Sequence, residues 1–198
     1  PDRKEYDFDA CAELVVESAR RGVNYFDTAP YYNDDNSEAI LGRALTIIRE
    51  AGWGSPGSPP AATGPLAGLP VCSSTKSCDY SVDKVRAQLE TSLKRLGVPR
   101  ITFYHIWNVL DPGDYARRMV KGGAYEAARR AQEEGLVEHV VISTHCSGSE
   151  IAAIAKEGRF EGVTLGYNIL NFRFRGEGVK AAGEAGMGVV TMNPLAGG

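Results

Sequence analysis

The sequence lacks the features that would direct it to a membrane, to nucleic acid or out of the cell. None of its apolar runs approaches the ~20 consecutive residues that a membrane-spanning helix needs. The opening residues, PDRKEYDFDA, are too polar for a secretory signal peptide. The net charge of -3 over 198 residues provides no basic surface for nucleic acid and no basic helix for a lipid surface. We therefore expect a cytoplasmic protein without nucleic-acid or membrane partners.

Residues that bind metals are also scarce, with three histidines and four cysteines in the whole chain. In a cytoplasmic protein these cysteines are expected to be reduced, and their spacing is not that of an iron–sulfur cluster. A zinc site that used both Cys72 and Cys78 is disfavoured. If extended, the chain between them spans ~20 Å, which is too far for one tetrahedral site. The sequence therefore predicts no metal site.

What the chain does contain is a regular alternation of two patterns. Short runs rich in β-branched and apolar residues, typical of strands, occupy 22–29, 69–76, 100–107, 137–144, 162–170 and 187–195. Helical periodicity occupies 9–22, 81–97, 114–135, 148–158 and 176–186. In 81–97, for example, apolar residues recur every three or four positions, and Gly97 stands where a helix would end. Helices between successive strands predict βαβ units and a parallel sheet.

The predicted fold class is α/β, a (β/α)8 TIM barrel that is incomplete in this chain. Such a barrel takes about 250 residues, so 198 residues hold about six or seven of its eight strands. The near-continuous apolar strands suit a sheet that is buried on both faces. A doubly wound open sheet is the alternative, and it is disfavoured because no Gly-rich phosphate-binding turn follows any strand.

The chain is expected to form one barrel domain, 1–198, with a single irregular stretch. The segment AGWGSPGSPPAATGPLAG, at about 51–68, is rich in glycine and proline and is typical of a flexible loop. It connects the helix after the first strand to the second strand, which places it at the amino-terminal face of a barrel. Active sites of barrels lie at the opposite face, so we interpret the segment as an insertion without a chemical role.

Polar residues mark the carboxyl ends of the predicted strands, where the active site of a barrel forms. Asp27 and Lys76 end adjacent strands and would pair across the mouth. A tyrosine of the next loop, Tyr31 or Tyr32, would lie beside the ammonium group, which lowers the tyrosine pKa from its usual value of about 10. Such a tyrosine can protonate an oxyanion as hydride reaches a carbonyl. The other strand-end residues are Trp107 with Asn108, Ser143 with His145, Asn168 and Asn193.

The same residues lie in motifs that resemble those of the aldo-keto reductase family. GVNYFDTAPYYNDDNSEAILGRAL (22–45) resembles the family signature, in which FDTA leads to a tyrosine and then to SE-x-x-LG-x-AL. SSTK (73–76) resembles the strand end that carries the family's lysine, and LETSLKRLGVPRITFY (89–104) resembles the helix and strand that follow. VISTH (141–145), YNIL (167–170) and GVVTMNPLAGG (188–198) resemble the later strands. The resemblance covers the chain from about residue 10 onward, and it is nearest to a subgroup that often carries an iron–sulfur module.

The resemblance implies a barrel that binds NADP or NAD and reversibly reduces the carbonyl group of a small molecule. The family's catalytic aspartate, tyrosine and lysine match Asp27, Tyr32 and Lys76, and the five-residue step from the aspartate selects Tyr32 over Tyr31. The substrate, the choice between NADP and NAD, and the oligomeric state are not specified by these motifs. The cofactor-binding residues implied are Ser143 and Thr144 for the nicotinamide amide, Met192 for the nicotinamide ring, and the turn from Asn193 to Leu195 for the phosphates.

One position departs from the family, which has a catalytic histidine at the end of its fourth strand. A count from Gly97 places Trp107 at that position and His105 two residues earlier. Side chains two apart in a strand point to the same face, so His105 would lie ~6.6 Å deeper, in a packed layer of the barrel. The indole N–H of Trp107 is a donor that can replace the histidine at the substrate oxygen. Losing an oxyanion donor altogether costs about 2.7–4 kcal/mol.

Trp107 therefore leaves three functions to be weighed. The first is an oxidoreductase that moves hydride between a nicotinamide cofactor and a carbonyl or alcohol. The second is a catalytically weak or inactive barrel that binds the nicotinamide nucleotide. The third is a lyase or isomerase that reuses the same pocket.

Overall fold

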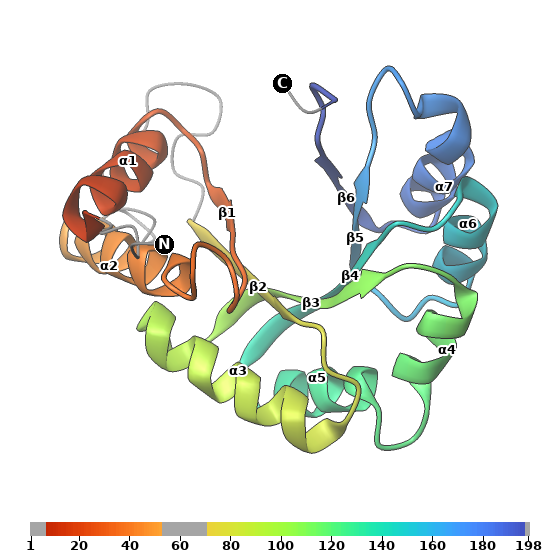
Figure 1. Ribbon diagram of the computed structural model, residues 1–198, viewed down its shortest axis with the longest axis horizontal. Coiled ribbons are helices and arrows are strands. Elements are labelled where there is room, and N and C mark those ends of the chain that lie inside the picture. Colours follow the sequence, from red (N-terminus) through yellow and green to blue (C-terminus); the bar gives the residue numbers. More distant parts are fainter. Residues whose placement is uncertain (1–6, 53–70, 197–198) are drawn as a thin grey trace, which may run out of the picture. The chain divides into compact units, whose positions relative to one another are not determined.

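The computed structural model describes residues 7–52 and 71–196, and within them helices and strands alternate along the chain (Figure 1). The elements are α1 (Phe8–Arg20), β1 (Tyr25–Asp27), α2 (Ser37–Glu50), β2 (Cys72–Ser77), α3 (Val82–Leu96), β3 (Ile101–Val109), α4 (Pro112–Met119), α5 (Ala124–Glu133), β4 (Val137–Thr144), α6 (Gly148–Lys156), β5 (Gly162–Gly166), α7 (Phe172–Glu184) and β6 (Gly188–Met192).

The strands form one sheet whose hydrogen-bonding order, β1 to β6, is the order of the sequence. The pairs β1–β2, β4–β5 and β5–β6 are parallel, and a helix connects the strands of each pair. A doubly wound sheet would reverse its strand order at a switch point, and this order does not reverse. The fold class is therefore the predicted incomplete (β/α)8 barrel, with six of its strands in the described residues.

The chain divides into two compact units. The N-terminal unit comprises Pro1–Thr75 and Gln88–Thr102, and the C-terminal unit comprises Lys76–Ala87 and Phe103–Gly198. No helix in the described part of the chain combines the length and the apolar character that a membrane crossing requires.

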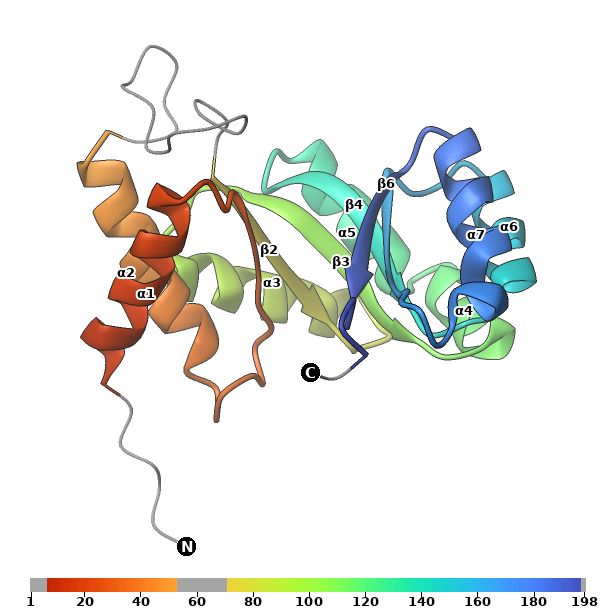
Figure 2. The same ribbon diagram turned by 90° about the horizontal axis from the view of Figure 1, so that it is seen from above.

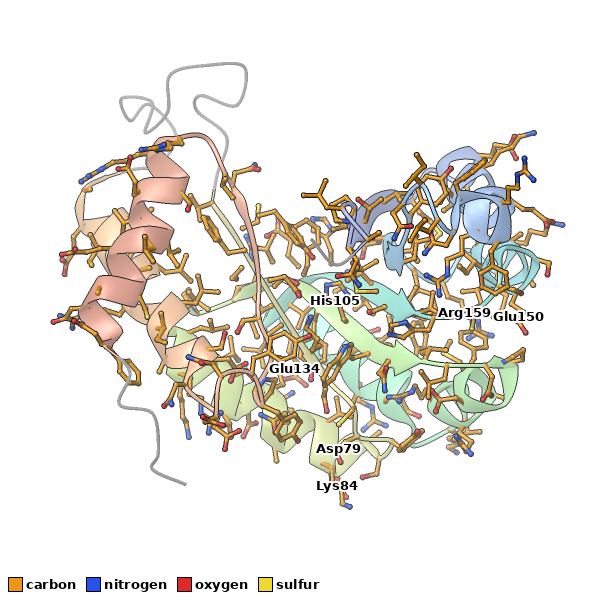
Figure 3. All side chains as sticks on the ribbon, turned by 45° about the horizontal axis from the view of Figure 1, so that its top comes forward. Asp79, Lys84, His105, Glu134, Glu150 and Arg159 are labelled. Carbon is orange, nitrogen blue, oxygen red and sulfur yellow. The ribbon has the colours of Figure 1, made fainter. Side chains whose placement is uncertain are left out.

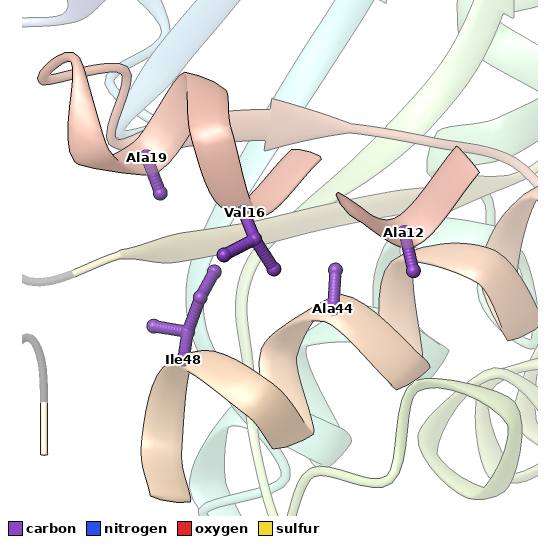
Figure 4. Packing of buried hydrophobic residues seen from close by; sticks show 5 residues of the cluster. All are labelled: Ala12, Val16, Ala19, Ala44 and Ile48. Atoms are coloured by element: carbon purple, nitrogen blue, oxygen red, sulfur yellow. The ribbon is translucent and has the colours of Figure 1, made fainter. Parts of the chain in front are cut away.

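The core of the N-terminal unit includes the contact between α1 and α2. Small side chains line this contact and let the two helix backbones approach closely (Figure 4). Gly42, two residues before Ala44 in α2, packs on the end of α3. A β-carbon added at Gly42 would lie 2.2 Å from the Arg95 carbonyl oxygen. Helix α3 ends at Gly97 as predicted, because this glycine has a φ of +62° and Val98 N–H donates to the Leu93 carbonyl. The buried residues at the α1–α2 contact are Ala12, Val16, Ala19, Ala44 and Ile48.

In the C-terminal unit, α6 and α7 lie side by side, and α7 packs next to β5 and β6 (Figure 2). Helix α6 starts with a capping box, in which Ser147 and Glu150 each bond to the other's backbone N–H. Gly178 brings α7 against α6, because a β-carbon there would lie 2.7 Å from the Ile151 Cβ. These contacts hold the loops that follow β4 and β5.

Three predicted elements need correction, and a fourth predicted segment falls outside the described residues. The helical pattern at 114–135 is two helices, α4 and α5, because Gly122 has a φ of +76° and Gly123 packs against backbone oxygens. The predicted strand 162–170 ends at Gly166, and the helix predicted at 176–186 begins earlier, at Phe172. The predicted insertion at about 51–68 lies outside the described residues from residue 53 onward.

Candidate functional site

The predicted site residues lie at the carboxyl ends of their strands. Asp27 is the last residue of β1, Lys76 precedes the last residue of β2, and Thr144 is the last residue of β4. Met192 ends β6, and Asn193 follows it. Each of these residues therefore stands at or next to the carboxyl end of its strand.

In the N-terminal unit, Asp27 is held against β2. Its Oδ1 accepts a hydrogen bond of 2.8 Å from the Ser74 hydroxyl, which in turn accepts one of 3.1 Å from the Tyr25 hydroxyl. Asp27 is also the register partner of Ser74, and the Thr28 N–H donates to the Ser74 carbonyl at 2.9 Å. The carboxylate position is therefore set by both backbone pairing and a side-chain chain of hydrogen bonds.

Tyr32 lies on the tight turn between β1 and α2. Its N–H donates to the Ala29 carbonyl, and its carbonyl accepts from the Ser37 N–H, each at 3.2 Å. The Tyr32 side chain is 40% exposed, whereas the Tyr31 hydroxyl donates to Gln88 on α3 at 3.4 Å. The three residues after Tyr32 all have left-handed backbone, which Asn and Asp tolerate better than other non-glycine residues. They are Asn33, Asp34 and Asp35, with φ of 56°, 51° and 67°.

In the C-terminal unit, Lys76 and Trp107 are in contact. The Lys76 side chain is 3% exposed, and its Nζ lies 5.6 Å from the centroid of the Trp107 ring. This distance is within the range of a cation–π interaction, which strengthens when the pair is shielded from water. His105 is 1% exposed on β3, as expected for a packed layer of the barrel (Figure 3). Asn108, which follows Trp107, has a left-handed φ of 60° within the strand.

The ends of β4, β5 and β6 are connected by hydrogen bonds. The Thr144 hydroxyl donates to the Val109 carbonyl at 2.9 Å and accepts from the Cys146 N–H at 3.1 Å. The Asn168 side-chain amide donates to the Asn193 carbonyl at 3.0 Å. Ser143 and Thr144 are both buried, while Leu195 is exposed. The predicted cofactor residues Ser143, Thr144 and Met192 therefore lie in the last residues of β4 and β6, and Asn193 and Leu195 follow β6.

Sequence reasoning missed Arg175, which fastens two of these loops. Its guanidinium donates to the carbonyls of Gly166, His145 and Cys146 at 2.8, 3.0 and 3.3 Å. Burial and then the Arg175 charge lower the pKa of His145, so this imidazole is neutral at pH 7. The sequence carried no signal for this role, because the predicted helix 176–186 begins after Arg175, whereas α7 begins at Phe172.

A second cluster that the sequence did not reveal connects the loop after β2 to α4. The Tyr80 hydroxyl donates to Asp114 at 2.6 Å, and Arg118 donates to the other Asp114 oxygen at 3.4 Å. The Arg118 guanidinium stacks 4.4 Å from the Tyr80 ring and donates to the Cys78 carbonyl at 3.2 Å. Burial by itself would raise the pKa of Asp114, but the hydrogen bonds from Tyr80 and Arg117 and the charge of Arg118 hold it below its ordinary value.

Two other features of the described residues add nothing to the predicted site. No three His, Cys, Asp or Glu side chains among residues 7–52 and 71–196 are grouped so that they could hold a metal ion. A hollow of about 490 Å³ lies between α2 and the end of α3, and none of the predicted site residues lines it.

Comparisons with known proteins agree on one family. The model of the Aldo/keto reductase family matches residues 2–198. Aflatoxin B1 aldehyde reductase member 2 of Rattus norvegicus is 30% identical in an alignment of 208 positions, gaps included, that covers 98% of this chain and 50% of that protein. The holo form of aldo-keto reductase AKR11C1 from Bacillus halodurans superposes with a TM-score of 0.74 at 22% identity, over 98% of this chain and 60% of that one. The Bombyx mori aldo-keto reductase AKR2E4 in complex with NADP superposes with a TM-score of 0.68 at 19% identity, over 96% of this chain and 58% of that one.

Proposed function

This chain belongs to the aldo/keto reductase family, and from that premise we propose that it is an oxidoreductase that moves hydride reversibly between NADP or NAD and a small-molecule carbonyl or alcohol. The rat relative is named an aldehyde reductase, and the Bombyx mori structure contains NADP, which supports the proposal. The chain spans about half the length of the rat relative, so the activity of the whole protein is part of the proposal.

The observation that carries the proposal is the burial of Lys76 at the carboxyl end of β2, where 3% of the residue is exposed. A lysine is almost never buried unless it is paired. In the proposed reaction Tyr32 donates a proton to the carbonyl oxygen, Lys76 is the cation that assists Tyr32, and Asp27 orients Lys76. A buried cation acts strongly on a neighbouring phenol because little water screens it. Asp27 already bonds to Ser74, which lies two residues before Lys76 and, by strand alternation, on the same face of β2.

The residues at the ends of β4 and β6 fit a nicotinamide nucleotide in their chemistry. We assign Ser143 and Thr144 to the amide, Met192 to the apolar ring face, and Asn193 with Leu195 to the phosphates. Thr144 already donates its proton to Val109, so its contribution is the remaining lone pair, which can accept from an amide NH₂. The nicotinamide, when bound, accepts or supplies the hydride. In the reducing direction Tyr32 supplies the proton that the carbonyl oxygen then needs.

We propose that the indole N–H of Trp107 takes the place of the family's catalytic histidine as a donor to the substrate oxygen. The ring face of Trp107 is engaged with Lys76, and the N–H lies on the ring edge, so the two interactions are compatible. The second function that this residue favours is a barrel that binds the nucleotide with little or no turnover.

The test is a fluorescence titration with NADPH and NADH, followed by turnover assays with a set of small aldehydes and ketones. We expect binding and turnover in wild type, and in Tyr32→Phe retained binding with turnover lower by about 10²–10⁴-fold, the usual contribution of a general acid. Binding without turnover in wild type would favour the nucleotide-binding function. Product formation without consumption of reduced cofactor would favour a lyase or isomerase, and absence of binding would refute both nicotinamide functions.

Trp107→Phe tests the N–H separately, because phenylalanine keeps a ring face for Lys76 and lacks the donor. Turnover should fall by about 10²–10³-fold, the usual effect of removing one oxyanion donor. Unchanged turnover in Trp107→Phe would refute the donor role.

A further inference from the structure

Glu38 has no role in the proposed chemistry, yet it is the most deeply buried carboxylate near the Tyr32 turn. It lies in the first turn of α2 and is 0% exposed. At that position a surface glutamate would already interact favourably with the helix dipole. Burying a carboxylate costs several kcal/mol unless it is paired and hydrogen-bonded. Its partners should therefore show what the burial achieves.

One carboxylate oxygen is bonded to the strand that carries Lys76. The Thr75 hydroxyl donates to Glu38 Oε1 at 2.7 Å, and Thr75 is itself 0% exposed. Thr75 is the residue before Lys76 in β2. A hydrogen bond to a carboxylate is stronger than one between neutral groups, so the bond from Thr75 restrains β2 at the residue adjacent to the lysine.

The other oxygen is connected to the turn that carries Tyr32. Arg95 Nη1 lies 3.5 Å from Glu38 Oε2 and donates to the Pro30 carbonyl at 3.3 Å. Pro30 is two residues before Tyr32. Ser37, the first residue of α2 and the one directly before Glu38, donates its N–H to the Tyr32 carbonyl. Glu38 thus reaches the turn through Arg95 on one side and through its own helix on the other.

We propose that Glu38 is a positioning residue that restrains both catalytic segments through one buried carboxylate: the Lys76 segment through Thr75, and the Tyr32 turn through Arg95. This inference rests on the proposed function for its catalytic meaning, and its structural content stands on the hydrogen bonds alone. We call the Thr75–Glu38 hydrogen bond the first arm, and the contacts from Glu38 through Arg95 to Pro30 the second arm. Each arm can be removed by its own substitution. Thr75→Val removes the first arm and keeps the shape of the side chain, Arg95→Met removes the second, and Glu38→Leu removes both.

The first experiment measures the protection of Lys76 by amine acylation and mass spectrometry, well below the melting temperature of each variant. Lys84 is exposed and serves as the reference within the same chain. Lys76 should be slow to react in wild type and about five- to tenfold faster in Thr75→Val, as expected for one lost hydrogen bond, and at least as fast in Glu38→Leu. Arg95→Met should leave Lys76 protected. Unchanged Lys76 protection in Thr75→Val and Glu38→Leu would overturn the first arm.

The second experiment follows the Tyr32 phenol by ultraviolet titration, as the difference between each variant and the same variant with Tyr32→Phe. The titration should shift in Arg95→Met and Glu38→Leu relative to wild type. Glu38→Gln, which keeps the volume and an acceptor for Thr75, is the milder variant if Glu38→Leu does not fold, and it should shift the Tyr32 titration while keeping Lys76 protected. Glu50→Gln, the same change at an exposed position on the same helix, is the control and should change neither readout. An unshifted titration in every folded variant would overturn the second arm.

Neither readout needs turnover, so failure of the proposed function is distinguishable from failure of this inference. Where wild type turns over, the pH profile of kcat should shift in Glu38→Gln by the same amount as the Tyr32 titration. A residue that only supported the fold would lower the melting temperature and leave Lys76 labelling, the Tyr32 titration and the kcat profile in place.

Discussion

Replacing Asp114 with asparagine should strongly destabilise the fold through the arginine that it leaves behind. Asp114 accepts hydrogen bonds from Tyr80, Arg117 and Arg118, and also from the Leu110 N–H at 3.2 Å. Arg118 is 2% exposed, so without the aspartate its charge remains buried and keeps only neutral partners. The perturbation is therefore an uncompensated buried cation.

The magnitude follows from that burial. Breaking a buried ion pair by removing one partner costs about 3–5 kcal/mol, and asparagine retains one acceptor oxygen, so we expect roughly 3 kcal/mol for Asp114→Asn. Arg117 contacts the same carboxylate from the surface, where its side chain is 68% exposed. Arg117→Gln should therefore lower the stability far less than Asp114→Asn does. Asp114→Leu combined with Arg118→Met removes both charges and should be close to wild type.

The pH dependence has a definite sign. The folded-state pKa of Asp114 lies below its ordinary value, because hydrogen bonds and the Arg118 charge outweigh the opposing effect of burial. Its contribution to stability is therefore complete above the unfolded pKa of about 3.9 and is lost as the pH falls through the folded value. The stability difference between wild type and Asp114→Asn should be constant near neutrality and shrink below about pH 4.

Urea denaturation followed by far-ultraviolet circular dichroism, at pH 7 and at steps down to pH 3, measures both quantities. A loss below ~1 kcal/mol at pH 7, or a double variant that is no more stable than Asp114→Asn, would show that the cluster does not behave as a buried ion pair. A difference that grows as the pH falls would refute the direction assigned to the pKa of Asp114.

Two further stability predictions follow from local packing. Gly42→Ala should destabilise the fold by roughly 1–3 kcal/mol or more, because the new β-carbon would lie 2.2 Å from the Arg95 carbonyl oxygen, and a backbone atom moves less easily than a side chain. Gly183→Ala is the control. Nothing lies within 4 Å of a β-carbon there, so this change should stabilise the fold by up to ~1 kcal/mol. Ser147→Ala should cost ~1 kcal/mol by removing the capping box of α6. Urea denaturation measures each, and equal stability of the two glycine variants, or an unchanged Ser147→Ala, would contradict them.

The fold was predictable because its signals are local. Apolar runs, helical spacing and a closing glycine such as Gly97 specify elements from neighbouring residues alone, and the alternation of elements then specifies a parallel sheet. The errors occur where local signals compete with tertiary contacts. Helix α7 begins at Phe172, where the exposed aromatics Phe172 and Phe174 obscure the amphipathic pattern. The predicted strand 162–170 stops early because Asn168 forms a turn with Leu170 and Asn171.

The residues that organise the site could not be predicted in the same way. Glu38, Arg118 and Arg175 are charged residues in helices, and a charged helical residue is most often solvated. Each is instead engaged with backbone or side chains from a distant part of the chain, and no spacing rule encodes such a contact. In the sequence, Glu38 is recognised only as the glutamate of the SE-x-x-LG motif. That motif indicates a family and does not explain why a carboxylate is needed at this position.

Trp107 has a contact in the structure that the sequence did not predict. The count along β3 assigns this residue to the place of a catalytic histidine, and the structure adds that its ring faces the Lys76 ammonium. A cation–π interaction is worth about 0.5–2 kcal/mol, but it stabilises the ammonium before, during and after the reaction. Only an interaction that strengthens in the transition state accelerates the chemical step. The ring face therefore accounts for the contact with Lys76 and not for a donor to the substrate oxygen, and the proposed donor is the indole N–H alone. For this reason Trp107→Phe, which keeps a ring face and removes the N–H, tests whether the indole donates to the substrate oxygen in a chain whose wild type turns over.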